Sequence, residues 1–94
     1  MREKREKVVE AVCNHLGNGK ANIREAAVTV ILNYSIIFLM KDDKEGRIQA
    51  LSGLAAIAGE KEDQVSKRLS AAVNNLSYKN SEAKDLAKSL GLLK

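Results

Sequence analysis

Residues 23–40 read IREAAVTVILNYSIIFLM, a helix-forming stretch that is apolar on most of its sides. A helix of this kind has to lie between neighbouring elements, because little of its surface suits water. Asn22 and Glu25 have the spacing of a capping box, which predicts that Asn22 is the N-cap of this helix. Before it, Gly17-Asn18-Gly19 favours the end of an earlier helix through a positive φ at the C-cap. The stretch therefore predicts an all-α fold built around one long helix.

Helical periodicity accounts for nearly every other segment of the chain. The apolar spacing predicts further helices over about 3–16, 45–58, 63–78 and 82–90, the last of them capped near Asn80. The chain has 94 residues, no proline and few aromatic side chains. This length suits one small domain, and a core of short aliphatic side chains buries only a modest area. We therefore expect a single domain of limited stability on its own.

The chain also contains an internal repeat, visible when the sequence is shifted by 42 residues. The landmarks that then coincide are Val9 with Leu51, Val12 with Leu54, Gly17 with Gly59, Ile23 with Val65, Ile31 with Val73, and Asn33-Tyr34-Ser35 with Asn75-Leu76-Ser77. A period near 40 with two or three helices per unit is typical of armadillo and HEAT repeats, which stack because no unit buries its apolar faces alone.

The repeat predicts an all-α, armadillo-like α-solenoid of about five helices. One unit covers about 3–41, a second covers about 45–79, and residues 80–94 begin a third. Two units are too few for a complete solenoid, so residues 1–94 are interpreted as a fragment of a longer module. The exposed repeat face at the N-terminal side makes self-association an expected property of such a fragment.

Composition and charge point to an intracellular protein with an acidic partner. The net charge is +4, from 16 basic and 12 acidic residues, which is a mild surplus and not the dense basic stripe of a nucleic-acid binder. The single cysteine, Cys13, cannot form an internal disulfide. No apolar run of secretory length follows the charged start, and the longest run, 35–40, is too short to span a bilayer. We expect a soluble cytoplasmic or nuclear protein with no membrane partner.

Several motifs, in order, resemble the PUL domain, the C-terminal armadillo-like domain of the phospholipase A-2-activating protein family. They are Asn22 through Ser35, Lys41-Asp42, Glu45-Gly46-Arg47, Gln49 through Ser52, Arg68 through Ala71, and Asp85 through Gly91. The resemblance covers about residues 22–91. It implies an armadillo-like fold of six repeats, of which this chain would hold the C-terminal part.

The resemblance also implies a function. In that family a basic groove docks the acidic C-terminal peptide of the valosin-containing AAA ATPase, which links the parent protein to ubiquitin-dependent protein turnover. The resemblance therefore implies a non-enzymatic protein-binding module, with this acidic peptide as its partner and no cofactor.

The candidate binding residues begin on the helix predicted at 63–78. Arg68, Ala71, Asn75 and Tyr78 fall at i, i+3, i+7 and i+10, so they share one face. Ala71 leaves room for a ligand, and Arg68 suits a carboxylate because its guanidinium can donate two parallel hydrogen bonds. By the resemblance, the matched position in the family is also basic. The alternative for Arg68 is an ordinary solvated surface side chain.

Asn33 and Asn75 occupy equivalent places in the two units. An amide side chain offers both a donor and an acceptor, which match the backbone of an extended peptide. The alternative is that these amides cap or bridge adjacent helices inside the stack.

Two further basic residues, Lys41 and Arg47, flank the loop between the units and extend the candidate positive patch, with Lys79 as a weaker candidate. The alternative, ordinary surface charges among Asp42 and its acidic neighbours, is favoured for both.

Tyr34 and Gly46 have structural interpretations. Tyr34 has apolar neighbours, including Phe38, and is predicted to pack in the core, although an aromatic ligand is the alternative. Gly46 is predicted to serve the turn into the helix at 45–58, through close packing or an unusual φ.

No active site is visible in the sequence. Cys13 and His15 are the only nucleophile and base of the usual types, and two residues apart on a helix they point about 200° apart, so they cannot form a dyad. One cysteine and one histidine also fall short of a zinc site. Gly17-Asn-Gly-Lys20 lacks the spacing of a phosphate-binding loop. We therefore expect no enzyme activity, metal or cofactor.

Two alternatives to peptide binding stay open. In the first, these repeats only cap a longer solenoid whose binding site lies elsewhere. In the second, the basic N-terminus binds nucleic acid weakly through Arg2, Lys4, Arg5 and Lys7. The second is disfavoured, because acidic residues alternate with these four and no base-stacking aromatic cluster accompanies them.

Overall fold

The computed structural model describes residues 2–93, with side chains from Lys4 to Leu93. The elements, in chain order, are α1 (Arg2–Cys13), α2 (Ala21–Lys41), α3 (Lys44–Leu54), a turn of 3-10 helix (Ala55–Ile57), α4 (Asp63–Ser77) and α5 (Ser81–Ser89). No strand occurs within residues 2–93. The predicted all-α, armadillo-like class is confirmed, and the five predicted helices are present with ends that differ by a few residues.

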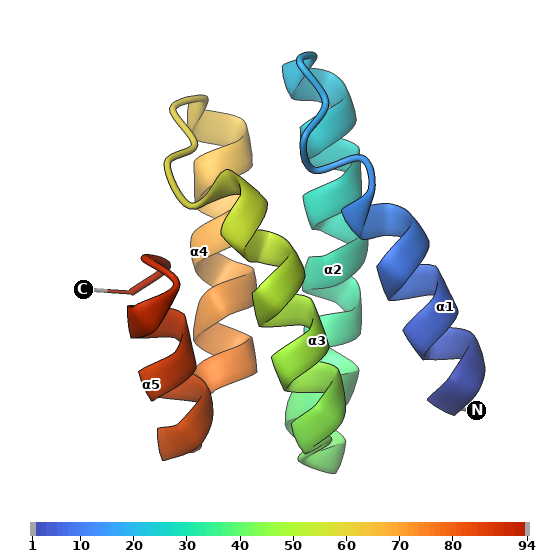
Figure 1. The fold of residues 1–94 in the computed structure, drawn as a ribbon, viewed down its shortest axis with the longest axis vertical. Helices are drawn as coiled ribbons and strands as arrows, with labels where there is room; N and C mark the ends of the chain where they lie inside the picture. The colour runs from blue at the N-terminus through green and yellow to red at the C-terminus, as the bar shows by residue number, and fades with distance from the viewer. Residues whose placement is uncertain (1, 94) are drawn as a thin grey trace.

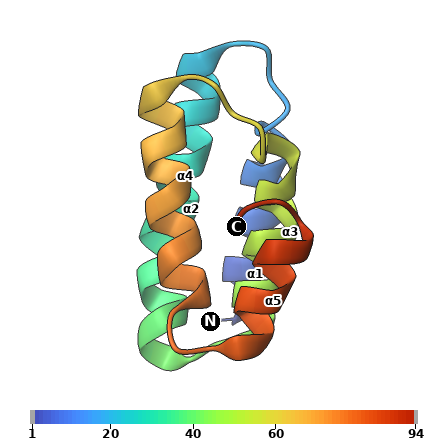
Figure 2. The same cartoon turned by 90° about the vertical axis from the view of Figure 1, so that its left-hand side faces the viewer.

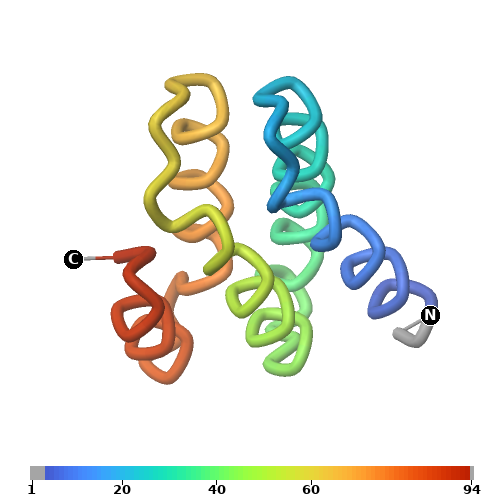
Figure 3. Tube along the Cα trace, turned by 45° about the horizontal axis from the view of Figure 1, so that its top comes forward, coloured from blue at the N-terminus to red at the C-terminus, as the bar shows by residue number. Residues whose placement is uncertain are grey.

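The helices form two layers. In Figure 2, α2 and α4 lie side by side in one layer, and α1, α3 and α5 lie in the other. Helices α2 and α4 run in the same direction and make the most extensive contact in the fold (Figure 1). The two helix pairs, α1 with α2 and α3 with α4, stand in a row with the chain termini at opposite ends of it (Figure 3). The result is a short solenoid in which α2 and α4 expose one common face.

Positions that a shift of 42 residues aligns hold equivalent places in the two pairs. Three aligned pairs are buried between the layers: Val9 with Leu51, Ile31 with Val73, and Ser35 with Ser77. The two buried serines are satisfied in the same way, since each hydroxyl donates to a backbone carbonyl of its own helix, that of Leu32 or Val73. Both helix pairs therefore use the same plan for the core.

Helix α2 is apolar enough to cross a membrane by length and composition, with a mean hydropathy of 1.6. In the fold it packs against α1, α3 and α4, and its buried stripe runs from Ala27 to Phe38. The expectation that the helix is enclosed on nearly every side is not met towards its C-terminal end. There, Ile36 and Met40 are 46% and 80% exposed.

The predicted capping box at the start of α2 is wrong. The helix begins at Ala21, its N-cap is Lys20, and no side chain caps it. The loop is held earlier, because the Asn18 side chain accepts a hydrogen bond of 2.8 Å from the Lys20 N–H. Asn22 is exposed within the helix, and Glu25 turns to another partner, described below.

The predicted positive φ at Gly17-Asn18-Gly19 is also wrong, since Gly91 is the glycine with positive φ in the described part of the chain. The end of α1 tightens instead into 3-10-type turns. The N–H groups of His15, Leu16 and Asn18 each bond the carbonyl three residues earlier. Such turns satisfy the last carbonyls of a helix without a left-handed residue.

Three local predictions are confirmed. Tyr34 packs against the core and stacks on Phe38, with ring centroids 6.1 Å apart. Gly46 serves close packing, because a Cβ atom there would lie 2.6 Å from the Phe38 ring. Asn80 caps α5 by accepting a hydrogen bond of 3.0 Å from the Ala83 N–H.

Candidate functional site

The exposed face of the α2–α4 layer carries a shallow pocket of about 480 Å³. Its lining residues are Leu32 of α2 and Asp63, Gln64, Lys67, Arg68 and Ala71 of α4. The two parallel helices meet here, and Ala71 contributes only a methyl group, so their junction remains hollow. We use the name α2–α4 furrow for this junction between the two helices, from Leu32 and Arg68 at the pocket to Leu39 and Tyr78 near the helix C-termini.

Arg68 crosses this furrow from α4 to α2. Its Nε lies 3.2 Å from Oε2 of Glu25, and its Nη1 donates to the Thr29 hydroxyl at 3.0 Å. The Thr29 hydroxyl in turn donates to the backbone carbonyl of Glu25 at 2.7 Å. The side chain of Arg68 is 41% exposed and that of Glu25 is 29% exposed. Arg68 is therefore anchored across the furrow while its side chain remains partly exposed.

Asn75 lies about two turns further along α4 and bridges the helices. Its Nδ2 donates to the Ser35 hydroxyl of α2 at 3.1 Å. The equivalent residue of α2, Asn33, is exposed and makes no side-chain hydrogen bond that the structure records in residues 4–93. The two amides differ because α4 has α2 beside it, whereas no helix of the described chain packs on the corresponding side of α2.

The lower end of the furrow combines apolar and charged residues. Tyr78, the C-cap of α4, is 51% exposed, and the Lys79 ammonium lies 5.5 Å from the centre of its ring. Tyr78 lines a small pocket together with Leu39 of α2 and the charged residues Asp42, Arg47 and Lys79. The exposed Ile36 and Met40 lie one turn apart in the C-terminal half of α2. Arg68, Asn75 and Tyr78 thus follow one side of α4 over about 15 Å, as their spacing predicts.

Arg47 also lines the small pocket beside Tyr78, but it is buried, so its favoured interpretation as an ordinary surface charge is wrong. It is 3% exposed. Its Nη1 donates to the carbonyls of Leu76 and Tyr78 at 2.9 and 3.0 Å, and its Nη2 lies 3.2 Å from Asp42. The last carbonyls of a helix have no partner within the helix and carry partial negative charge, which a cation satisfies. Arg47 therefore fastens the end of α4 to α3.

Lys41 is exposed at the end of α2, but its surroundings are of mixed charge. The hollow beside it is lined by Arg5, Lys41, Asp42, Asp43 and Lys44. Arg5 lies 4.0 Å from Asp43. The side chain of Arg2, named above as a candidate nucleic-acid contact, lies outside the described residues. This end of the molecule therefore presents no uniformly positive surface in its described part.

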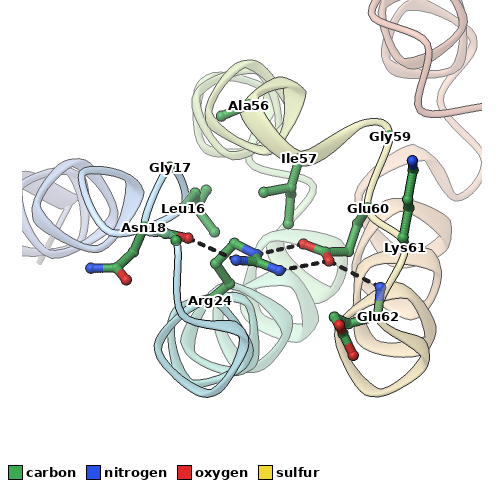
Figure 4. Close-up of a pocket in the computed structure, with 11 residues that line it drawn as sticks. Leu16, Gly17, Asn18, Arg24, Ala56, Ile57, Gly59, Glu60, Lys61 and Glu62 are labelled. Atoms are coloured by element: carbon green, nitrogen blue, oxygen red, sulfur yellow. Dashed lines mark hydrogen bonds and ion pairs between the residues drawn. The ribbon is translucent and has the colours of Figure 1, made fainter.

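A second hollow, of about 540 Å³, lies between the loop after α1 and the loop before α4, and Figure 4 shows its lining. Arg24 lies in this hollow and forms a bidentate ion pair with Glu60, in which Nε and Nη2 of Arg24 donate to the carboxylate oxygens at 2.7 and 3.0 Å. Its Nη1 donates to the Asn18 carbonyl at 2.8 Å (Figure 4). The hydrogen bond raises the pKa of Arg24 and lowers the pKa of Glu60. These two charges satisfy each other, and their ion pair links the first helix pair to the second. We call this ion pair the Arg24–Glu60 clamp.

The described residues contain neither an activated thiol nor a cluster of metal-ligating side chains. Cys13 is half-buried against Gly53, and burial raises the pKa of its thiol, which disfavours the reactive thiolate. No cluster of three or more metal-ligating side chains occurs within the described residues. His15 lines an apolar hollow on the free side of α2 with Val12, Ile23, Ala26, Ala27 and Val30.

The sequence located the α4 side of the furrow but missed the α2 side. Glu25, Thr29 and Leu32 contribute to it, yet α2 is apolar over so much of its surface that no periodic signal separated its exposed side from its buried one. The spacing of 43 residues between Glu25 and Arg68, close to the repeat length, was the one available sign that they could meet.

A comparison with protein families gives a match over the whole chain. The family model of the PUL domain covers residues 1–94. No curated protein and no solved structure matches the chain.

Proposed function

Since the chain belongs to the PUL domain family, we propose that the α2–α4 furrow binds an acidic peptide. Members of this family are protein-interaction modules rather than catalytic ones. The partner that the family suggests is the acidic C-terminal tail of the valosin-containing AAA ATPase. The module then acts in ubiquitin-dependent protein turnover, in the cytoplasm or nucleus. The observation that carries the proposal is the position of Arg68, which lines a pocket beside the small residue Ala71 and has a partly exposed side chain.

The chemistry of the lining fits a carboxylate. Arg68 and Lys67 are neighbours on the pocket wall, and Ala71 leaves the approach open. A guanidinium binds a carboxylate through two parallel N–H bonds, and an ammonium adds a point charge beside it. Mild net positive charge on the whole chain also favours the approach of an acidic partner.

The lower furrow fits apolar side chains of the same peptide. Ile36, Met40 and Tyr78 are three of the few large hydrophobic residues that the fold exposes. Exposed aromatic and methionine side chains are enriched at protein interfaces, where their burial supplies much of the binding energy. We therefore propose that acidic residues of the peptide lie at Arg68 and apolar residues lie towards Tyr78.

A fluorescence-anisotropy titration with the labelled acidic tail peptide tests this function. We expect saturable binding that weakens at least tenfold in Arg68→Glu, because the change replaces an attraction with a repulsion. Lys84→Glu is the matched control, since it makes the same change of charge on exposed α5, in the other layer. A scrambled peptide of the same composition controls for charge alone. An equal loss of affinity in Arg68→Glu and Lys84→Glu would contradict a site in the furrow.

A second candidate function is structural, with these repeats capping a longer PUL domain whose binding site lies elsewhere. The apolar hollow of about 270 Å³ on the free side of α2 favours it, because the aligned side of α4 is the one that packs on α2. This alternative predicts that the 94-residue chain does not bind the tail peptide while a longer PUL domain binds it. The same titration separates the two functions.

A further inference from the structure

Arg68 is already paired within the fold at the place where a partner carboxylate would bind. A guanidinium offers two edges for a bidentate carboxylate, one formed by Nε with Nη2 and the other by Nη1 with Nη2. Glu25 lies at Nε, 3.2 Å away, and Thr29 accepts a hydrogen bond from Nη1 at 3.0 Å. Each edge therefore has one of its two nitrogens engaged by α2.

We infer that Glu25 is an internal competitor of the peptide, which a partner carboxylate displaces from Arg68, and this inference rests on the proposed function. The Glu25 carboxylate has the same chemistry as the ligand and reaches Arg68 from the opposite wall of the furrow (α2 and α4 lie side by side in Figure 1). Glu25 thereby limits the affinity of the furrow and determines which acidic peptides it accepts.

The partial exposure of the Arg68–Glu25 ion pair favours replacement of Glu25 by a carboxylate of the peptide. Both side chains are partly open to water, and an ion pair of this kind contributes little to stability because solvent and salt screen it. Thr29 differs from Glu25 in being neutral. Its hydroxyl donates to the backbone of its own helix, so it remains in place after Glu25 leaves. Displacing Glu25 therefore frees the Nε edge at low cost while Thr29 still holds the guanidinium in the furrow.

The competition makes the furrow selective for peptides with several carboxylates. A peptide with one carboxylate exchanges one ion pair at Arg68 for another and gains little. A peptide with two or more closely spaced carboxylates also reaches Lys67, which is exposed on the same pocket wall. No ion pair of Lys67 is recorded within residues 4–93, so a carboxylate there has no internal competitor, whereas the carboxylate at Arg68 first has to displace Glu25.

The test is a double-mutant cycle by fluorescence anisotropy with the labelled acidic tail peptide. We expect Glu25→Gln to tighten binding about two- to fivefold, the range typical of an exposed ion pair. In the Arg68→Gln background the same change should have no effect. Asp63→Asn is the matched control, because Asp63 lines the same pocket and loses the same charge without contacting Arg68 in any recorded bond. Titrations at about 0.15 M salt screen long-range effects of charge.

The outcomes separate this inference from the proposed function. Weaker binding in Glu25→Gln, an unchanged affinity, or the same gain in Asp63→Asn or in the Arg68→Gln background overturns the competition while binding through the furrow stands. Failure of both the wild type and Glu25→Gln to bind overturns the proposed function, and the competition with it, since freeing Arg68 then reveals no site. Thermal unfolding of each variant checks that the fold is intact.

Discussion

Asn75 of α4 donates a hydrogen bond to the buried hydroxyl of Ser35 on α2, across 40 residues of sequence. The same Ser35 hydroxyl donates to the carbonyl of Leu32, so it takes part in one bond within its helix and one between helices. This small network joins α2 and α4 near the C-terminal end of α4. Asn75 lies between Arg68 and Tyr78 on α4, so the packing of α4 on α2 and the candidate site share this residue.

Asn75→Ala should destabilise the fold by about 1 kcal/mol, because it removes the donor to a buried hydroxyl. The matched control is Asn33→Ala at the equivalent position of α2, where the side chain is exposed and the change should be close to neutral. Urea unfolding followed by circular dichroism measures both. Equal stabilities for the two variants would show that the bond to Ser35 contributes nothing.

Arg47→Met should cost about 1–3 kcal/mol, because it leaves the carbonyls at the end of α4 without their donor in a buried place. Lys41→Met, which removes an exposed charge nearby, is the control and should change the unfolding free energy by less than about 0.5 kcal/mol. Chemical denaturation provides the comparison. If Arg47→Met is as stable as Lys41→Met, the role assigned to Arg47 is wrong.

Gly46→Ala should destabilise the fold by about 1–3 kcal/mol, since the added methyl group would overlap the Phe38 ring in a well-packed core. Gly17→Ala provides the contrast. Nothing lies within 4 Å of a Cβ atom at Gly17, and its φ is not positive, so alanine should be neutral or slightly stabilising. Differential scanning calorimetry distinguishes them. Similar melting temperatures would mean that α3 can move away from Phe38 without cost.

The Arg24–Glu60 clamp should make stability depend on pH. The hydrogen bond from Arg24 holds the pKa of Glu60 below its ordinary value in the folded chain. Its contribution is therefore fully present above the unfolded-state pKa and is lost as the pH falls through the folded-state pKa. As the pH falls below the ordinary pKa of a glutamate, wild-type stability should therefore fall more steeply than that of Glu60→Gln. Glu10→Gln, on the exposed side of α1, should follow the wild type. Parallel curves for all three proteins would argue against the clamp.

The sequence predicted what depends on local pattern. Apolar periodicity located all five helices, the Asn80 cap was recognised from its residue type, and the 42-residue shift aligned positions that are buried in both helix pairs. These features depend on residues near one another in the chain or on a repeated motif. The predicted cap at Asn22 was wrong because the helix begins earlier, at Ala21, and the loop is held by Asn18, outside the helix.

The sequence did not predict contacts that depend on how the helices cross. Arg47 looked like a surface charge, but its acceptors are backbone carbonyls about 30 residues away, and backbone groups leave no mark in a sequence pattern. Glu25 was read as part of a capping box and instead lies against Arg68. Half of the candidate site, the wall provided by α2, therefore became visible only from the packing of α2 on α4.

The most direct test of the central claim is a titration of the ¹⁵N-labelled chain with the unlabelled acidic tail peptide, followed by amide chemical shifts. A site in the α2–α4 furrow predicts saturable shifts that are largest around Leu32, Arg68 and Ala71, extend towards Tyr78, and leave the exposed side of α5 unchanged. The largest shifts on α5 or in the hollow around Val12 and Ile23, or no saturable shifts at all, would contradict it.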